Sequence, residues 1–436
     1  MSREPGRQRL IAFHLPQFHP IPENDRWWGQ GFTEWTNVDR GRAQYAGHRQ
    51  PHVPAELGYY DLRENTAREA QSHLAREYGI DGFCYYYYWF AGKRLLERPV
   101  EAMLAGGAPD LPFCLCWANE NWTRRWDGKD REILIAQQHS REDDIAIIHD
   151  LARHFRDPRY IRIGGRPLMI VYRTDLIPDP RAMVKTWRAE CDRLGIGEIY
   201  LCCVRRVGMQ DPRPFGFDAI VGFPPNDSVA AEISSEVPEK NADFGGRIFD
   251  YCEIALDAFR RRHIQLPCFP GVMPSWDNTA RRRERSHVYH GATPLRYRSW
   301  LAQAMRISRQ DRALPEPLVF INAWNEWAEG CHLEPDADHG RAWLEATLAA
   351  RADAAQGRGL WGEFGPRVPV LPVKEECRLA GAPIEDVLTV VRPLAVPVIA
   401  PSTFARFVAT LRKRLDRWPM LTRLAVRAAR SVGLAD

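Results

Sequence analysis

The chain has 436 residues, of which 11% are aromatic, and a formal net charge of +4. From Thr403 to the C-terminus, eight Arg or Lys stand against two Asp, so the preceding body is close to neutral. A nearly neutral body excludes nucleic acid as the main partner, and the length suits one barrel of about 250 residues or more with long loops.

Eight short apolar runs predict buried strands. They are Leu10–Leu15, Gly82–Tyr87, Phe113–Trp117, Leu168–Tyr172, Ile199–Val204, Ala219–Phe223, Cys268–Met273 and Leu318–Ala323. Between them, apolar residues at three- and four-residue spacing predict the amphipathic helices Thr66–Tyr78, Asp143–Arg156, Pro180–Leu194, Tyr251–Arg262 and Pro294–Ser308. Ser140 is a predicted N-cap for the second helix, and Pro180 stands in the first turn of the third.

This alternation predicts the α/β class, as a (β/α)8 TIM barrel with long catalytic-face loops and a C-terminal helical extension. A doubly wound sheet is the alternative, but no Gly-x-Gly-x-x-Gly turn follows any predicted strand. We expect a glycan-active barrel over residues 1–360 and an irregular Pro-rich extension over 361–402. Residues 403–436 read as a basic amphipathic tail, which would lie on an anionic membrane surface or pack on the barrel.

Indole, phenol, amide and carboxylate side chains gather just after the predicted strands, where a barrel places its active site. Flat rings stack on sugar C–H faces, and polar groups bond sugar hydroxyls, so this mixture predicts a carbohydrate site. The candidate substrate-binding residues are His19, Trp28, Glu34, Trp35, Tyr88, Trp89, Trp117, Asn119, Glu120, Trp122, Arg124, Trp276, Asp277, Asn325, Trp327 and Glu334.

The candidate catalytic acids, Glu326 and Glu329, follow the last predicted strand. Two carboxylates three positions apart meet on one side of a helical turn but point oppositely along a strand, so the chain must leave the strand by Glu326. One acid would then need a raised pKa while the other stays ionised. The alternative is a pair of structural acids bound to Arg or to backbone amides.

Several long motifs resemble one known family. They are Ala12–Pro22, Trp28–Asn37, Asp81–Phe90, Cys116–Asp127, Trp276–Thr279 and Asn322–Pro335. Their order is similar to that of the WbsX-type proteins, which are called polysaccharide-biosynthesis glycosyltransferases or glycoside hydrolase family 99-like proteins. True family 99 enzymes are retaining endo-α-mannosidases on a (β/α)8 barrel. The resemblance implies that Glu326 is the base acting on the substrate 2-hydroxyl, and that Glu329 is the acid that protonates the leaving oxygen.

Other residues have competing interpretations. One loop contains Asn119, Glu120 and Asn121, which either bind substrate or form hydrogen bonds that structure the loop. The same loop contains Arg124 and Arg125, which either hold a phosphate or form salt bridges. His14, His19, His48 and His52 lack the spacing and flanking acids of a metal site, so we expect no metal and no cofactor. Asp336-Ala-Asp338 has the form of a nucleotide-metal motif, which also arises by chance. Glu334 is more typical of an orienting group.

Three functions stay open: a retaining glycosidase or transglycosidase of a cell-surface polysaccharide such as O-antigen, a glycosyltransferase building it, and a non-catalytic glycan-binding barrel. The partner would be an oligo- or polysaccharide, in the biosynthetic case a lipid-linked one. The N-terminal segment from Met1 to Arg9 is not apolar, no run approaches about 18 apolar residues, and the cysteines sit in apolar runs. We therefore expect reduced thiols and a cytoplasmic protein, with peripheral contact at the inner membrane face through its tail.

Overall fold

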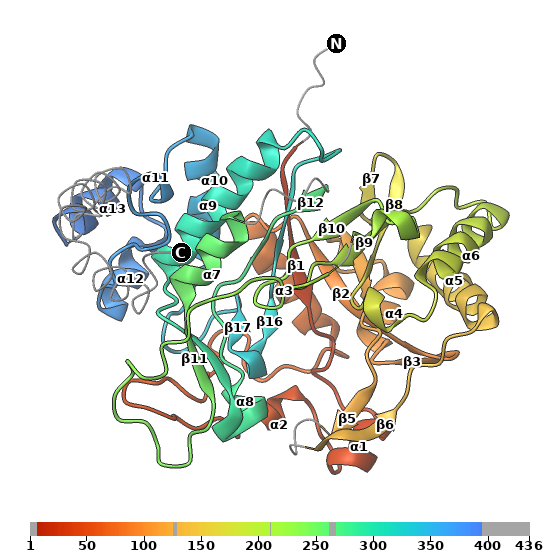
Figure 1. Ribbon diagram of the computed structural model, residues 1–436, viewed down its shortest axis with the longest axis horizontal. Helices are drawn as coiled ribbons and strands as arrows, with labels where there is room; N and C mark the ends of the chain where they lie inside the picture. Colours follow the sequence, from red (N-terminus) through yellow and green to blue (C-terminus); the bar gives the residue numbers. More distant parts are fainter. Residues whose placement is uncertain (1–6, 125–128, 210, 261–266, 395–436) are drawn as a thin grey trace, which may run out of the picture. The chain divides into compact units, whose positions relative to one another are not determined.

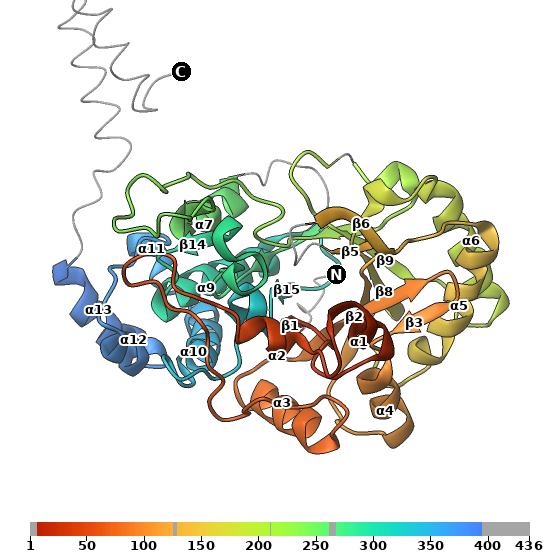
Figure 2. The same ribbon diagram turned by 90° about the horizontal axis from the view of Figure 1, so that it is seen from below.

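The computed structural model describes residues 7–124, 129–209, 211–260 and 267–394. Within this part, nine parallel strand segments form a nearly closed barrel with helices outside (Figures 1 and 2). Their order is β12 (Cys268–Phe269), β10 (Ala219–Val221), β9 (Tyr200–Val204), β8 (Arg166–Val171), β4 (Phe113–Trp117), β2 (Gly82–Phe90), β1 (Arg9–His14), β15 (Leu318–Ile321) and β13 (Gly271–Val272). The predicted (β/α)8 barrel is confirmed.

The barrel closes through one interrupted strand. β12 and β13 are separated in the chain only by Pro270, which has no N–H to donate to a neighbouring strand. β12 pairs with β10 and β13 pairs with β15, so the two halves of this strand join opposite neighbours. A Cβ on Gly271 would clash with the carbonyl oxygen of Gly222, so this close approach requires glycine. Eight strand positions therefore surround the core.

The predicted helices appear close to their expected bounds as α3 (Asn65–Glu77), α5 (Arg141–Phe155), α6 (Pro180–Arg193), α7 (Tyr251–Arg260) and α9 (Pro294–Gln310). The Oγ of Ser140 accepts a hydrogen bond from the Asp143 N–H at 3.1 Å, and Pro180 begins α6, as predicted. The structure adds α4 (Arg98–Gly106) and α10 (Ala342–Gln356). In Figure 1, α5 lies beside α6 and α9 lies beside α10, on opposite sides of the barrel.

Long loops after the strand C-termini carry secondary structure of their own. These elements are α1 (Pro22–Trp28), α2 (Glu34–Val38), β3 (Lys93–Leu95), β5 (Trp122–Arg124), β6 (Lys129–Ile135), β11 (Arg247–Asp250), α8 (Thr279–Arg282), β14 (His287–His290), β16 (Asn325–Glu326) and β17 (Cys331–His332). Most of them gather at the bottom of Figure 1. A short strand β7 (Arg162–Ile163) lies at the opposite end and pairs with the start of β8. The barrel thus has one elaborated face, as a catalytic face requires.

The Pro-rich extension is more regular than predicted. Residues 361–394 contain α11 (Trp361–Phe364), α12 (Val373–Ala380) and α13 (Ile384–Val391). The prediction of irregular chain is therefore wrong there, because each helix is only four to eight residues long and too short to show a clear apolar period. The predicted tail, 403–436, lies outside the described residues. The three-part domain division stays a prediction.

The interior is apolar throughout the barrel. Strands β4, β8, β9 and β15 are buried along almost their whole length, which explains their continuous apolar sequences. All ten cysteines are free thiols, and eight of them are buried, as predicted for small reduced hydrophobes. Among the described residues, no helix is long and apolar enough to cross a membrane.

Candidate active site

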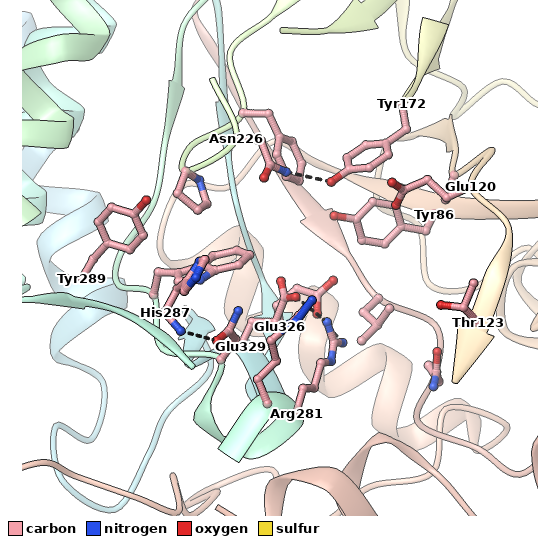
Figure 3. A pocket seen from close by; sticks show the side chains of 18 of the residues that line it. Tyr86, Glu120, Thr123, Tyr172, Asn226, Arg281, His287, Tyr289, Glu326 and Glu329 are labelled. Carbon is pink, nitrogen blue, oxygen red and sulfur yellow. Dashed lines mark hydrogen bonds and ion pairs between the residues drawn. The ribbon is translucent and has the colours of Figure 1, made fainter. Parts of the chain in front are cut away.

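A cavity of about 690 Å³ opens at the elaborated face of the barrel. Its wall comes from loops that follow β1, β2, β4, β8, β10, β13 and β15, so side chains far apart in sequence converge there. This volume is typical of small-molecule and sugar-sized ligand sites. Figure 3 shows Glu326, Glu329 and Arg281 gathered on one side, with Tyr86, Tyr172 and Glu120 across from them.

The two candidate catalytic acids face the same cation. Arg281 Nη2 lies 2.9 Å from Glu326 Oε2, and Arg281 Nη1 lies 2.6 Å from Glu329 Oε1. A third carboxylate, Glu34, lies 2.7 Å from Arg281 Nε. The side chain of Glu326 is 6% exposed and that of Glu329 is 21% exposed, so Glu329 is the acid more open to the cavity.

The local chain path explains why both acids face one way. The barrel strand β15 ends at Ile321, and the chain then forms the antiparallel pair β16–β17 around the short 3-10 turn η6 (Trp327–Glu329). The chain has therefore left the barrel strand before Glu326, which is the condition set from the sequence. Gly330 closes the turn with φ of +56°, and a Cβ there would lie 2.9 Å from Asp277.

Three carboxylates around one guanidinium leave an excess of negative charge. Burial raises the pKa of Glu326, and Glu329 and Glu34 raise it further, while Arg281 opposes the shift. Burial disfavours the charged form of Arg281, yet the three carboxylates hold the pKa of this guanidinium well above its usual value. A proton on one of the three acids would relieve the repulsion, and acid–base catalysis uses one protonated and one ionised acid.

A second buried acid supports the turn from behind. Glu334 Oε1 accepts hydrogen bonds from Gln71 Nε2 at 2.7 Å and Trp324 Nε1 at 2.8 Å. Its Oε2 accepts from Tyr60 Oη at 2.8 Å and Trp327 Nε1 at 2.6 Å. Burial raises the pKa of Glu334 to about 7, although these four donors favour the ionised form. Because Trp327 follows Glu326 directly, this network fixes the backbone that carries the catalytic pair.

The opposite wall offers neutral hydroxyl and amide groups. Asn226 Nδ2 donates to Tyr172 Oη at 2.8 Å, and Glu120 Oε1 lies 2.6 Å from Arg173 Nη1. Burial raises the pKa of Tyr86 and of Tyr88, and the nearby charge of Glu326 raises both further. These phenols therefore stay protonated and can donate hydrogen bonds to sugar oxygens.

Comparison with known proteins identifies the family. The family model described as glycosyltransferase WbsX matches residues 10–347. The chain belongs to this family. Two curated relatives from two strains of Xanthomonas campestris pv. campestris, both named uncharacterized protein WxcX, are 51% identical over 341 residues. The match covers 78% of this chain and 49% of each relative, so the chain spans about half the length of the curated relatives it matches.

A solved structure shares the fold of this WbsX-family chain. The GH99 endo-α-mannosidase from Bacteroides thetaiotaomicron, in complex with bis-tris-propane, aligns with a TM-score of 0.51 and 14% identity. The alignment covers 80% of this chain and 97% of that enzyme. The resemblance to the WbsX family seen in the motifs is confirmed by the family model, and this solved structure shows that the chain has the same barrel fold as a GH99 enzyme.

Seven of the predicted site residues line the cavity of this WbsX-family barrel. They are Trp28, Tyr88, Glu120, Trp122, Trp276, Glu326 and Glu329. They come from four different loops and from strand β2, so the fold brings together residues spread over some three hundred positions. Their catalytic and binding roles stay predictions.

Four predicted residues lie behind the wall instead of on it: Glu34, Asn325, Trp327 and Glu334. Asn325 Oδ1 accepts from the Leu15 N–H at 2.7 Å, and its Nδ2 donates to the Leu15 carbonyl at 3.0 Å. The other three bind Arg281 or one another, as described above. Their burial and their protein partners place these four side chains off the cavity wall, and the orienting role of Glu334 stays a prediction.

Two predicted tryptophans point away from the cavity because side chains alternate along a strand. β2 runs on to Phe90, so Tyr88 faces the cavity while Trp89 faces outward and donates to Asp143 Oδ1 at 2.9 Å. Trp117 is buried against Trp187 of α6, with ring centroids 5.7 Å apart. Neither tryptophan is on the cavity wall, so their predicted substrate contact has no support from this geometry. For Trp89 the sequence ended the strand too early, at Tyr87, whereas β2 continues to Phe90.

Five further predicted residues are absent from the cavity wall, and all of them except His19 have hydrogen-bond or ion-pair partners in the protein: His19, Trp35, Asn119, Arg124 and Asp277. His19 is fully buried, and Trp35 donates to the Tyr60 carbonyl at 2.8 Å. Asn119 bonds the backbone of Arg173 through both amide atoms, so the loop-structuring alternative is the observed one. Arg124 pairs with Glu132 at 2.5 Å, which is the predicted salt-bridge alternative. The substrate contacts expected for these five stay predictions, and their positions off the wall do not support them.

The histidines and the Asp-x-Asp tripeptide also have structural roles. Asp277 Oδ2 binds His48 Nε2 at 2.6 Å and Gln50 Nε2 at 2.5 Å. Asp336 Oδ1 accepts from the N–H groups of Asp338 and His339 at 2.8 and 2.6 Å, so it caps its own turn. Among the described residues, no group of three His, Cys, Asp or Glu side chains is placed to hold a metal ion.

Sequence reasoning missed the residue that organises the site. Arg281 lies two positions after the motif Trp276–Thr279, and this location after a predicted strand was the available signal. Tyr86, Tyr172 and Asn226 also line the cavity without having been singled out. Tyr86 and Tyr172 lie within or at the end of predicted strands, so only the alternation of inward and outward positions identifies them.

Proposed function

We propose that this chain is a carbohydrate-active enzyme of cell-surface polysaccharide metabolism, with the retaining chemistry of an endo-α-mannosidase-like glycoside hydrolase. The observation that carries the proposal is the pair Glu326 and Glu329 on one cavity wall, bound to the same Arg281. The family assignment and the barrel shared with a GH99 enzyme support it. The substrate would be an oligo- or polysaccharide with an α-mannose-like linkage, carried on a lipid during biosynthesis.

In the proposed reaction, Glu326 removes the proton from the C2 hydroxyl of the sugar being cleaved. The C2 oxygen then attacks C1, the glycosidic C1–O bond breaks, and Glu329 protonates the leaving oxygen. Glu329, now ionised, takes a proton from water or a second glycan, whose oxygen opens the 1,2-anhydro ring at C1. Glu326 returns its proton to the C2 oxygen, so both acids are restored and the anomeric configuration is retained.

The geometry assigns Arg281 a defined task in this scheme. The reaction starts from ionised Glu326 and protonated Glu329, although burial favours the protonated form of Glu326. The guanidinium opposes that effect in part, and the pKa of Glu326 stays at about 8, so the ionised base is a minority form at neutral pH. Glu329 is the more exposed of the two acids, which suits a group that meets both the leaving oxygen and the incoming nucleophile. Tyr86 and Tyr88 would bond the sugar hydroxyls as neutral donors.

Two alternatives have an observation in their favour. The family model carries the description glycosyltransferase, which favours a transferase that builds the polysaccharide from an activated donor. Glu326 and Glu329 both form ion pairs with Arg281, as acids with a purely structural role would. This observation favours a non-catalytic glycan-binding barrel. We rank the glycosidase first because both acids line the cavity, whereas the structural acids Glu34 and Glu334 lie behind its wall.

The deciding experiment is mass spectrometry of glycans after incubation with lipid-linked polysaccharide from the source bacterium, in water enriched in heavy oxygen, with and without nucleotide sugars. Shortened chains that carry heavy oxygen at the new reducing end are expected. Glu326→Gln and Glu329→Gln should each remove this product while the far-UV spectrum stays unchanged. Chains that lengthen only with added donor would establish the transferase, and binding without product in every sample would establish the silent barrel.

The proposal also includes the location. We propose a cytoplasmic protein in which residues 403–436 contact the inner membrane face, because eight basic residues lie there among apolar ones. This places the enzyme where lipid-linked glycans are assembled.

A further inference from the structure

One wall of the cavity is a two-stranded ribbon that carries chemistry which the Glu pair does not use. β11 and β14 pair in parallel, with Arg247 opposite His287 and Phe249 opposite Tyr289. All four of these side chains line the cavity. The residues between them, Ile248 and Val288, are buried in a separate apolar cluster with Tyr45 and Val237. The period-2 alternation of the strands therefore presents a polar and aromatic face to the cavity and an apolar face to the protein.

The exposed face of the ribbon is a stacked ladder. Arg247 Cζ lies 4.9 Å from the centroid of the Phe249 ring, a cation–π distance. The Phe249 and Tyr289 rings stack with centroids 5.1 Å apart and planes at 22°. His287 meets the Phe249 ring edge-on, with centroids 5.7 Å apart. These contacts hold the rings in fixed orientations, so the ladder offers a flat surface beside a guanidinium.

This wall is basic, whereas the wall with Glu326 is acidic. Burial lowers the pKa of His287, and the positive charges of Arg282 and Arg247 lower it further while Glu232 opposes them, so His287 is a neutral imidazole beside two arginines. Arg282, the last residue of α8, also lines the cavity. Arg247 Nη2 lies 2.7 Å from Glu232 Oε2, and both side chains are at least 40% exposed. Arg247 thus already binds one carboxylate in a position that solvent and ligands can reach.

We propose that the ladder of Arg247, Phe249, His287 and Tyr289, with Arg282, is a subsite for an acidic sugar residue of the glycan. This inference rests on the proposed function and names the substrate class. Tyr289 provides a flat face for the pyranose ring, the buried Phe249 ring supports it by stacking, and Arg247 and Arg282 bind the carboxylate through charge-assisted hydrogen bonds. The excess negative charge of the Glu34, Glu326 and Glu329 cluster repels the same carboxylate. The two ends of the cavity therefore orient the glycan, with its acidic residue on the ribbon and a neutral residue at the Glu pair.

The test compares two ligands that differ only at C6: methyl α-D-mannopyranosiduronate and methyl α-D-mannopyranoside. Binding is measured by NMR titration of the full chain carrying Glu326→Gln, so that the result does not depend on turnover. We expect the acidic glycoside to bind roughly 10-fold more tightly or better, the value of a charge-assisted hydrogen bond. Arg247→Gln and Arg282→Gln should each remove most of this advantage and leave the neutral glycoside unaffected.

Two further variants make the test specific. Glu232→Gln removes the carboxylate that competes for Arg247, so it should strengthen binding of the acidic glycoside only. Arg378→Gln is the matched control, because Arg378 is also an exposed arginine paired with a glutamate, Glu375, but lies on α12 and not on the cavity wall. This control should leave both affinities unchanged.

Equal affinity for the two glycosides would overturn the subsite, and so would an acidic preference that survives both Arg247→Gln and Arg282→Gln. GDP serves as the probe for a nucleotide donor. If GDP binds with a dependence on Arg247 and Phe249 and the acidic glycoside does not, the wall is a donor site and the acidic-sugar proposal is wrong. A failed subsite together with heavy-oxygen incorporation in the hydrolysis assay would leave the proposed function intact.

Discussion

Replacing Arg281 with Gln removes the cation shared by three carboxylates and retains much of the side-chain volume. The lost ion pairs are 2.7, 2.9 and 2.6 Å long, to Glu34, Glu326 and Glu329. Two unit charges about 4 Å apart interact by about 4 kcal/mol at an effective dielectric constant of about 20. Removal of one partner of a buried ion pair costs about 3–5 kcal/mol in practice, because the remaining charge is left unpaired. We expect Arg281→Gln to be folded but strongly destabilised at neutral pH.

The cost should depend on pH in a defined direction. Burial already raises the pKa of Glu326 to about 8, so this acid keeps its proton between pH 5 and pH 7 in both proteins. Without the guanidinium, the other two carboxylates lose their shared cation, and we expect the folded variant to retain a second proton that the unfolded chain releases. A raised folded pKa gives stability that is present below the unfolded value and lost as the pH rises through the folded one. One extra retained proton costs about 1.4 kcal/mol per pH unit, so the variant should lose about 3 kcal/mol more than the wild type between pH 5 and pH 7.

Urea unfolding of both proteins at pH 5 and pH 7, followed by tryptophan fluorescence, measures this difference. Arg285→Gln is the control, because Arg285 is an exposed arginine just beyond α8, and its replacement should change the free energy of unfolding by less than about 0.5 kcal/mol at either pH. A loss for Arg281→Gln that is the same at both pH values would refute the charge argument. In turnover, the acidic limb of the pH–rate profile should move to higher pH, since ionised Glu326 is the base.

Four other perturbations test separate parts of the molecule. Glu334→Gln replaces one carboxylate oxygen, which accepts two hydrogen bonds, with an NH2 group that cannot accept them. We expect the free energy of unfolding, measured by urea titration, to fall by about 1–3 kcal/mol. Gly271→Ala places a Cβ against the Gly222 carbonyl, so the melting temperature should fall; an unchanged value would contradict the tight closure of the barrel. Trp276→Ala removes a ring from the cavity wall and should raise KM more than it lowers kcat in steady-state assays. Deletion of 403–436 should abolish cosedimentation with anionic vesicles, and retained binding would rule out the tail as the membrane contact.

The sequence predicts the barrel because each barrel strand is buried on both faces and therefore has a continuous apolar sequence. All eight predicted strands appear, with ends shifted by a few residues. The seventh shows the limit: Cys268–Met273 reads as one run, yet Pro270 divides it into two segments that bind different neighbours. Strand pairing is a contact between distant parts of the chain, and a single run carries no record of its partner.

In the candidate site too, local sequence patterns were predictable, whereas contacts between distant residues were not. The acid pair stood out because Glu326 and Glu329 follow an apolar strand within three residues of each other, and family motifs reinforced that local signal. Trp89 was misassigned because one residue of difference in a strand moves a side chain to the opposite face. The sequence could not place Asn119, because an asparagine that binds a ligand and one that binds the backbone look identical in a sequence.

By itself, the sequence identified the class of fold, the family and the two candidate acids, because each of these depends on residues that are contiguous in the chain. Only the tertiary structure decided that Arg281, 45 positions before Glu326, forms ion pairs with that acid and with Glu34 and Glu329. It also decided that β11 and β14 turn a basic and aromatic face toward the same cavity. Charges and stacked rings act over a few ångströms of space, so their effects appear only when folding brings distant residues within that range.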